Sequence, residues 1–449
     1  MLDELAEHCA EALTRYDCPS VSVAVVERGR VVYAEAYGLA DVATGRPATP
    51  DTAYGLCSVT KPVTATAVCV AHDAGLLDLD SPVPDGDPRW AAPTVRDLLR
   101  HRAGLGAYYD WDYGDGAPRI DPDRYTTRYR APGAAFEYAN LGYRTTARVL
   151  ETATGRSLAG YARDAVFAPL GLDSCHIGRS HPGPAPTAVR YTVDGRAYPD
   201  YDCGHPGATL GWASAPDLAL FAQTYDRLLA PETAAATRDA LPVNDHLGYG
   251  LGWCVSSGDG PVVLSHGGGG GGVAALAFAV PERQLAAAVL CNSTNKAARD
   301  TVVRHLLSAL VPGAGPEGIT PAVPDPVRPL ALTAARWAGG IVAPERTVPL
   351  EVRVRADRSV ELRIDGAPVP AEVDASTAWD LRAHLAWQLP TADARVNSPT
   401  LGIALRLDGE ALVGVAHAYK EGDAEGWLGN FLNHPVELSQ CSSDSELCT

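Results

Sequence analysis

One histidine followed by six glycines, His266 to Gly272, constrains the fold of this chain more than any other stretch. Glycine loses more backbone entropy on folding than any other residue, so a glycine run taken alone favours a flexible loop. This run, however, directly follows the strand-like residues 261–265 and precedes the apolar residues 273–280. Whether it is a loop or part of a sheet therefore depends on the motifs found elsewhere in the chain.

Composition places the chain among soluble globular proteins of two or more domains. It has 449 residues, of which 46% are hydrophobic and 20% charged. The net charge of −17, with no concentrated basic window, excludes nucleic acid as a partner. Apolar runs of about 18 residues are absent, so we predict no transmembrane helix and no membrane partner. The first residues are acidic and have helical periodicity, which predicts a cytoplasmic protein without a secretory signal.

The cysteines predict reduced thiols and no metal site. Ten cysteines are scattered through apolar contexts, and no Cys-x-x-Cys or His-x-x-x-His pair occurs. The Cys203-Gly204-His205 triplet is too isolated to indicate a metal ligand set. We therefore expect no metal and no other cofactor.

The first part of the chain, residues 1–311, predicts an α+β domain. After an N-terminal helix, residues 20–38 read as a β-hairpin around the polar turn at 27–30. An apolar helix follows at 56–76, then helices and long loops to about 240. Strands return between 249 and 292, and a helix closes the domain. This order indicates a mostly antiparallel sheet covered by helices, with a helical subdomain inserted.

A second, all-β domain is predicted at 331–440. It follows a linker at 312–330 that is rich in Pro and Gly, and precedes a flexible tail at 441–449. Apolar and polar residues alternate at 350–354, 360–364 and 403–407, the last before an Asp408-Gly409 turn. The pattern favours a small barrel or sandwich.

The first chemical motif is Ser58-Val59-Thr60-Lys61. The three-residue spacing puts Ser58 and Lys61 on one face at the start of the predicted helix. Taken alone, Ser58 could simply cap that helix and Lys61 could be solvated. The residues after Lys61 are apolar on nearly every face, however, so the amine is expected to be buried, which is costly without a task. Desolvation would lower its pKa and let it take a proton from Ser58.

Two further motifs complete a known pattern. Tyr138-Ala139-Asn140 and His266-Gly267-Gly268, each weak alone, follow the Ser58 motif in the order found in serine β-lactamases of class C type, DD-peptidases and related esterases. The flanking residues 98–105, Leu-Leu-Arg-His-Arg-Ala-Gly-Leu, also resemble that family. The chain resembles this β-lactamase and penicillin-binding-protein-like family over most of residues 8–310. The resemblance implies a β-lactamase/transpeptidase-like sheet with a helical subdomain.

The resemblance also implies catalytic roles. Ser58 would attack an acyl donor and form an acyl-enzyme, with Lys61 as the base. Tyr138 would carry the proton to the leaving group and later activate the acceptor. Asn140 would orient Lys61 and bind the substrate amide. His266 stands where the family has Lys or His, so it joins the catalytic set.

The glycines receive a role from the same resemblance. The oxyanion hole would combine the backbone N–H groups of Ser58 and Gly269, while Gly267 and Gly268 would bind substrate. Gly270 to Gly272 are then the turn into the next strand. Gly267 lacks the hydroxyl that many relatives carry there, which weakens the case for a β-lactamase that binds a substrate carboxylate. Cys57 is expected to pack in the core.

The substrate is left open between related enzymes. The layout resembles stand-alone thioesterases of the penicillin-binding-protein type, which have a C-terminal lipocalin-like domain; Trp337 resembles the tryptophan that plugs such barrels. That resemblance implies release of a nonribosomal peptide from a peptidyl carrier protein by macrolactam formation. The alternative is a cytoplasmic D-stereospecific peptidase, amidase or esterase acting on a peptide or small-molecule acyl donor. A third hypothesis is a binding or scaffold protein of the same fold.

Overall fold

The computed structural model describes residues 4–183, 185–258, 260–319, 324–391, 399–420 and 422–441. Contacts along the chain divide it into two compact units. Unit 1 consists of Met1–Gly104, Ala131–Val323 and Asp423–Trp427, and unit 2 of Leu105–Arg130, Pro324–Gly422 and Leu428–Thr449. Each unit thus takes a segment from the part of the sequence assigned to the other domain, an exchange that the sequence did not indicate. The predicted tail at 441–449 lies, except for Cys441, outside the described residues.

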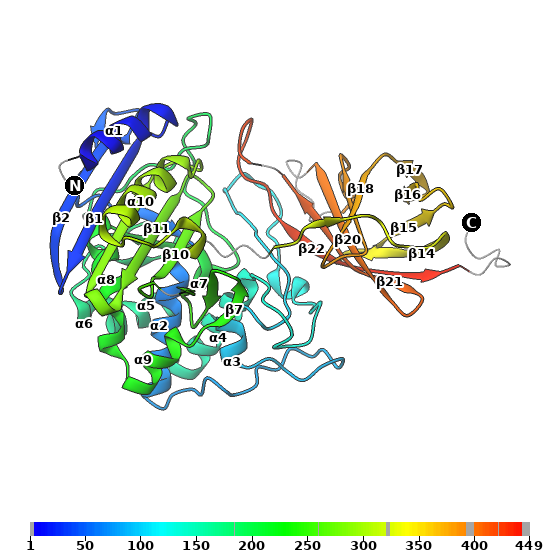
Figure 1. The fold of residues 1–449 in the computed structure, drawn as a ribbon, viewed down its shortest axis with the longest axis horizontal. Coiled ribbons are helices and arrows are strands. Elements are labelled where there is room, and N and C mark those ends of the chain that lie inside the picture. Colours follow the sequence, from blue (N-terminus) through cyan, green and yellow to red (C-terminus); the bar gives the residue numbers. More distant parts are fainter. Residues whose placement is uncertain are drawn as a thin grey trace. The chain divides into compact units, whose positions relative to one another are not determined.

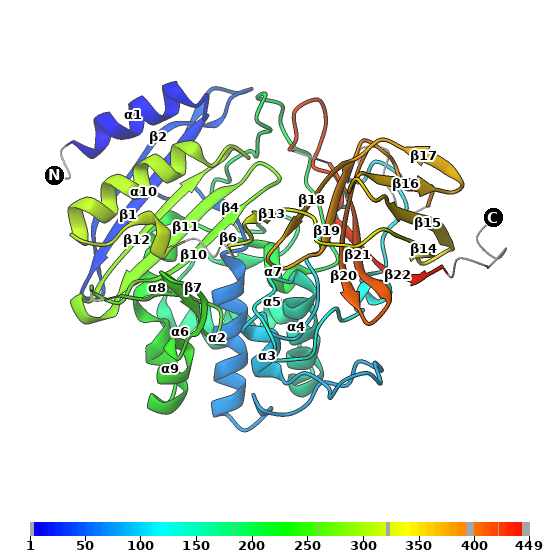
Figure 2. The same ribbon diagram turned by 45° about the vertical axis from the view of Figure 1, so that its right-hand side comes forward.

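Unit 1 is built on an antiparallel sheet of nine strands, in the order β3-β2-β1-β12-β11-β10-β9-β8-β7. Helices α1 and α10 lie on one face, and α8 packs on the other (Figures 1 and 2). A separate three-stranded sheet has the order β4-β6-β5. The helices are α1 Leu5–Arg15, α2 Thr60–Asp73, α3 Val95–Leu99, α4 Asn140–Thr154, α5 Leu158–Ala162, α6 Ala168–Leu170, α7 Pro206–Thr209, α8 Ala215–Thr224, α9 Pro231–Arg238 and α10 Ala297–Leu310. The strands are β1 Ser20–Glu27, β2 Arg30–Asp41, β3 Arg46–Pro47, β4 Tyr54–Cys57, β5 His176–Ile177, β6 Gly211–Ala213, β7 Leu241–Asn244, β8 Leu247–Tyr249, β9 Cys254–Ser256, β10 Leu264–Gly269, β11 Ala274–Val280 and β12 Leu285–Cys291.

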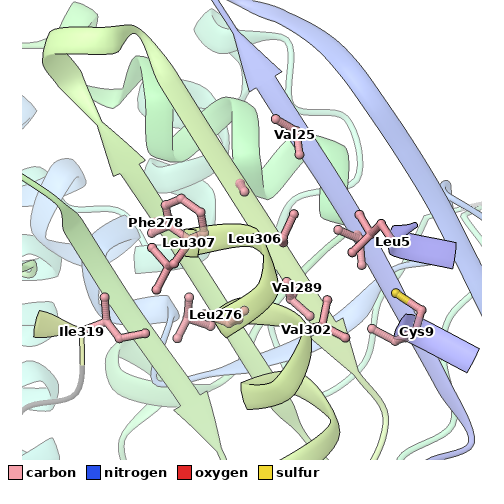
Figure 3. Packing of buried hydrophobic residues seen from close by; sticks show 14 of the residues in the cluster. Leu5, Cys9, Val25, Leu276, Phe278, Val289, Val302, Leu306, Leu307 and Ile319 are labelled. Carbon is pink, nitrogen blue, oxygen red and sulfur yellow. The ribbon is translucent and has the colours of Figure 1, made fainter. Parts of the chain in front are cut away.

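The core of unit 1 lies between the sheet and helices α1 and α10. Figure 3 shows Val25 of β1, Phe278 of β11 and Val289 of β12 pointing toward Leu5 of α1 and Leu306 of α10. Alternate residues of the central strands face the other side, where α8 packs, so these strands are buried on both faces. Each fully buried aliphatic side chain contributes about 1.5–3 kcal/mol. The packing of these central strands holds β10, which is the neighbour of β11 in the same sheet, in place.

The sequence predictions for unit 1 agree with these elements in most places. The hairpin of β1 and β2 turns at Arg28 and Gly29, both with positive φ (49° and 75°), as a tight two-residue turn requires. The predicted apolar helix begins at Thr60. Among the described residues, no helix is long and apolar enough to span a membrane.

Unit 2 is built on one antiparallel sheet of ten strands, in the order β13-β18-β19-β20-β21-β22-β14-β15-β16-β17. The predicted alternation is visible in β15, where Leu350, Val352 and Val354 are buried. Trp337 is buried in the core of this sheet and donates from Nε1 to the Glu410 carbonyl, 2.9 Å away. The strands are β13 Val327–Arg328, β14 Ala335–Val342, β15 Thr347–Val354, β16 Val360–Ile364, β17 Ala367–Val369, β18 Glu372–Ser376, β19 Leu381–Leu385, β20 Thr400–Asp408, β21 Ala411–Tyr419 and β22 Leu432–Gln440.

Candidate active site

Ser58 lies in a tight turn between strand β4 and helix α2. The sequence placed it at the start of the helix, but α2 begins two residues later, at Thr60. Cys57, just before the serine, has a φ of 47°, a conformation that costs a residue with a side chain about 1–2 kcal/mol. The Thr60 hydroxyl donates to the Cys57 carbonyl and accepts the Gly211 N–H, at 2.6 and 2.8 Å. These contacts fix the turn that presents Ser58.

Lys61 is fully buried and its amine meets three oxygen atoms. Nζ lies 3.1 Å from Ser58 Oγ, 2.8 Å from Asn140 Oδ1 and 3.2 Å from the Ala208 carbonyl of α7. Burial lowers the pKa of Lys61 to about 7. A neutral amine has two N–H donors and one lone pair. Asn140 and Ala208 accept the two donors, which leaves the lone pair for the Ser58 hydroxyl proton.

Tyr138 and Asn140 are brought to the same place by the start of helix α4. Asn140 is its first residue and is buried, with its oxygen on the Lys61 amine. Lys61 Nζ also lies 4.6 Å from the centre of the Tyr138 ring. The structure therefore brings Ser58, Lys61, Tyr138 and Asn140 together, as the motif order predicted.

His101 supports this arrangement and was not among the predicted site residues. Its Nδ1 accepts the Ala139 N–H at 3.1 Å, and its carbonyl accepts the Glu137 N–H at 2.8 Å. The centre of its ring lies 4.2 Å from that of the Tyr138 ring, with the two ring planes tilted by 35°. Burial, followed by the Lys61 charge, holds the pKa of His101 well below its usual value, so the ring is neutral. The sequence signal that could have indicated His101 is its place in the Leu-Leu-Arg-His stretch, which resembles the family.

His266 is also neutral, and its protonation pattern follows from its contacts. Nδ1 lies 2.8 Å from the Gly267 carbonyl, which can only accept, so Nδ1 carries the proton. Nε2 then accepts the Tyr249 hydroxyl at 3.0 Å. Burial lowers the pKa of His266 to about 3, with a further contribution from Lys61. The histidine thus adds no positive charge at neutral pH.

The glycine run is divided between a strand and a turn. Strand β10 ends at Gly269, and Gly271 and Gly272, with φ of 60° and 78°, form the two-residue turn into β11. The Gly270 N–H donates to the Val273 carbonyl at 3.0 Å. Because hydrogen-bonded and non-bonded pairs alternate in an antiparallel ladder, Gly269 and Ala274 form a non-bonded pair. The Gly269 N–H and C=O therefore point away from β11.

The edge to which Gly269 points is the one occupied by the nucleophile turn. Its carbonyl accepts the Cys57 thiol at 3.3 Å, which confirms that Cys57 packs internally, and its N–H points to the same side. A Cβ added to Gly268 would lie 2.1 Å from the Leu56 carbonyl oxygen and 3.1 Å from the Ser58 nitrogen. The Ser58 nitrogen therefore lies beside β10 at the residue next to Gly269, where the predicted oxyanion hole of the Ser58 and Gly269 N–H groups needs it. Gly267 faces the opposite side of the strand, toward Arg299.

Comparisons with known proteins agree with this geometry. The model of the β-lactamase family matches residues 3–310. A D-aminopeptidase of Cereibacter sphaeroides is 27% identical over 379 residues, covering 78% of this chain and 73% of the relative. The solved structure of SurE with D-Leu has a TM-score of 0.64 at 23% identity and covers 92% of this chain and 96% of SurE. D-amino acid amidase from Ochrobactrum anthropi SV3 has a TM-score of 0.56 at 21% identity, over 69% of this chain and 99% of the amidase.

The fold and the site together define a class. The antiparallel sheets with their helical layers form a mixed α/β, β-lactamase-like fold, which penicillin-binding protein homologues and class C β-lactamases share. This chain belongs to the β-lactamase family, whose members are serine hydrolases. The resemblance stated from the three motifs is confirmed.

Proposed function

We propose that this protein is a serine acyl-enzyme hydrolase that acts at the carbonyl of a D-configured residue in a peptide or amide. The observation that carries the chemistry is the Lys61 amine, buried at 3.1 Å from Ser58 Oγ with its other hydrogen-bonding capacity taken by Asn140 and Ala208. The preference for D-residues is supported by the relatives, which include a D-aminopeptidase and a D-amino acid amidase.

The reaction follows from the positions of these groups. Neutral Lys61 takes the proton of Ser58 as Oγ forms a bond to the substrate carbonyl carbon. The N–H groups of Ser58 and Gly269 bind the resulting oxyanion. The C–N bond then breaks, and the amine leaves with a proton delivered from Lys61 through Tyr138. Water attacks the acyl-enzyme, its proton returns along the same groups, and the acid leaves with Ser58 restored.

The neutral His266 supports an acyl donor without a carboxylate beside the reacting bond. A family member that binds an anionic substrate gains from a cation at this position, whereas His266 has a pKa near 3 and contributes a neutral ring. Gly267 adds no hydroxyl on this strand. The site therefore favours simple amides and esters over β-lactams.

A second candidate function uses the same acyl-enzyme on Ser58 but a different acyl acceptor. In a macrocyclising thioesterase, Ser58 would take a peptide from a carrier-protein thioester, and the peptide's own amine would replace water. This candidate rests on the two-domain layout, and the likeness of fold to SurE covers 92% of this chain and so extends beyond the residues that match the β-lactamase family. Under this candidate function, the sheet of unit 2 is a lipocalin-like domain and the protein acts in the cytoplasm. Both candidates place a D-residue at the attacked carbonyl.

One set of substrates tests both candidates. One portion of the wild-type protein is labelled with a fluorophosphonate. A separate, unlabelled portion is assayed with D-alanine and L-alanine p-nitroanilides and with a peptidyl N-acetylcysteamine thioester ending in D-Leu or L-Leu. We expect a mass increase on Ser58 and a D-preference of at least about ten-fold in kcat/KM. Linear acid supports the hydrolase, and cyclic product supports the thioesterase.

The variant Ser58→Ala is tested beside a matched control, Ser257→Ala, which changes the exposed serine directly after β9. The first variant should lose labelling and turnover, and the second should retain both. If wild-type protein never acquires an adduct on Ser58, the proposal of a serine acyl-enzyme is contradicted, and the hypothesis of a binding or scaffold protein remains.

A further inference from the structure

Arg299, in the first turn of helix α10, is a buried cation that the proposed reaction does not use. Its side chain is 8% exposed. Nη1 donates to the Gly268 carbonyl at 2.9 Å and to the Ala275 carbonyl at 3.1 Å. Nε and Nη2 donate to Asp300 Oδ1 at 2.8 and 2.5 Å. The guanidinium thus lies against β10 and β11 on the face opposite Ser58.

The Gly268 carbonyl belongs to the peptide unit that carries the Gly269 N–H. In the ladder, Gly268 and Ala275 form the pair that exchanges backbone hydrogen bonds, so the Gly268 oxygen accepts from both Ala275 and Arg299. A hydrogen bond to a peptide carbonyl polarises the whole unit, which strengthens the N–H at its other end as a donor. A charged donor polarises it more than a neutral one.

The glycines make this contact possible. A Cβ at Gly267 would lie 3.9 Å from Arg299 Nη1, so the space beside the guanidinium is open at this residue. Arg299 itself is held by Asp300 on one side and by the two carbonyls on the other, which fixes its planar group in one orientation.

We propose that Arg299 is a positioning residue of the oxyanion hole: its guanidinium orients and polarises the Gly268–Gly269 peptide, so that the Gly269 N–H binds the oxyanion more strongly. This inference rests on the proposed acyl-enzyme function. Arg299 acts through the peptide and does not touch the substrate. Its contribution appears when negative charge develops on the substrate oxygen, and therefore in kcat rather than in KM.

The test compares Arg299→Met, which keeps the length of the stem and removes the donors, with Arg299→Lys and Arg304→Met. We expect Arg299→Met to lower kcat about ten-fold at constant KM, a fraction of the loss known for removing a whole oxyanion donor. Its affinity for phenylboronic acid, which forms an anionic tetrahedral adduct on Ser58, should fall by a similar factor. Arg299→Lys should recover part of both, and Arg304→Met, which removes an exposed guanidinium from the same helix, should keep both near wild type.

The outcomes separate this inference from the proposed function. Wild-type protein without fluorophosphonate labelling at Ser58 overturns the function itself. If wild type is labelled at Ser58 but a folded Arg299→Met keeps its kcat and its affinity for the boronate, the proposed role of Arg299 is overturned. A loss of kcat without a loss of boronate affinity also overturns it, because the arginine would then be structural. If Arg299→Met does not fold, Arg299→Gln takes its place, because its neutral amide polarises the peptide less than the guanidinium does: a folded Arg299→Gln with wild-type kcat and boronate affinity overturns the inference.

Discussion

At the scale of single residues, the site depends on the cost of burying one amine. Lys61 has no carboxylate partner among the contacts described; its amine meets only neutral oxygens. Burial without a counter-charge disfavours the ammonium form, which brings its pKa from 10.5 to about 7. The same burial that would be a defect in a structural lysine supplies a base at neutral pH.

The rate at which Ser58 is acylated should therefore rise with pH. Below pH 7 the ammonium form has no lone pair, and above pH 7 the neutral amine accepts the serine proton. We expect an ascending limb with an apparent pKa of about 7, measured as the rate of fluorophosphonate labelling between pH 5 and 9. Lys61→Arg should abolish the limb and most of the labelling. A flat profile in wild-type protein would show that Lys61 is not the base.

The same pKa predicts a pH effect on stability. In the unfolded chain the lysine pKa is 10.5, so between pH 7 and 10.5 the unfolded state binds more protons than the folded state. The Lys61 contribution to the free energy of unfolding therefore rises with pH across this window and is constant below it. Other groups also titrate in this pH range. The useful quantity is therefore the free energy of unfolding of wild type minus that of Lys61→Met, measured by urea denaturation. That difference should increase from pH 7 to 9.5; a constant difference would contradict the lowered pKa.

At the scale of elements, β10 holds the site together because it has no side chains after His266. Gly268 allows the strand to pass directly beside the nucleophile turn, and Gly271 and Gly272 allow the turn into β11. A Cβ on Gly272 would lie 2.4 Å from Arg190 Cβ, at a φ of 78°. Gly272 is therefore as constrained as the glycines that face the site, and it is a poor control for them.

Gly267 and Gly268 provide the matched comparison instead. Gly268→Ala places a methyl group 2.1 Å from the Leu56 carbonyl, so strand and turn must separate, whereas Gly267→Ala has no neighbour nearer than 3.9 Å. We expect Gly268→Ala to lower kcat/KM at least about a hundred-fold, because the oxyanion donors move apart, and Gly267→Ala to retain activity within about three-fold. Steady-state kinetics with a circular dichroism check on folding measure both. Equal losses would show that β10 is not the wall of the site.

At the scale of the whole molecule, the sequence and the structure agree where chemistry and periodicity are local. The Ser58 and Tyr138 motifs, the β1–β2 turn and the alternation in β15 could all be read from short stretches. The neutral state of His266 and the contact of Arg299 with Gly268 could not, because each depends on atoms far apart in the sequence. The inclusion of Asp423–Trp427 in unit 1 had no local signal either.

The segment Asp423–Trp427 gives the last prediction. Asp423 is fully buried in unit 1, where its carboxylate accepts the Tyr198 hydroxyl at 2.6 Å and the Val193 N–H at 3.0 Å. Tyr198 packs beside Tyr201, whose hydroxyl donates to the Gly271 carbonyl in the turn after β10. Asp423→Ala removes an acceptor from the buried Tyr198 hydroxyl, at a cost of about 1–3 kcal/mol, whereas the Val193 N–H is only partly buried and can turn to water.

We therefore expect Asp423→Ala to lower the free energy of unfolding by about 1–3 kcal/mol in denaturant titration. Because the loosened tyrosines contact the turn that ends β10, kcat should also fall at temperatures where the variant is still folded. Glu425→Gln, an exposed change in the same segment, is the matched control and should leave both quantities unchanged. An Asp423→Ala variant as stable as Glu425→Gln would mean that this segment does not stabilise unit 1, and the link from it to the glycine turn would fail with it.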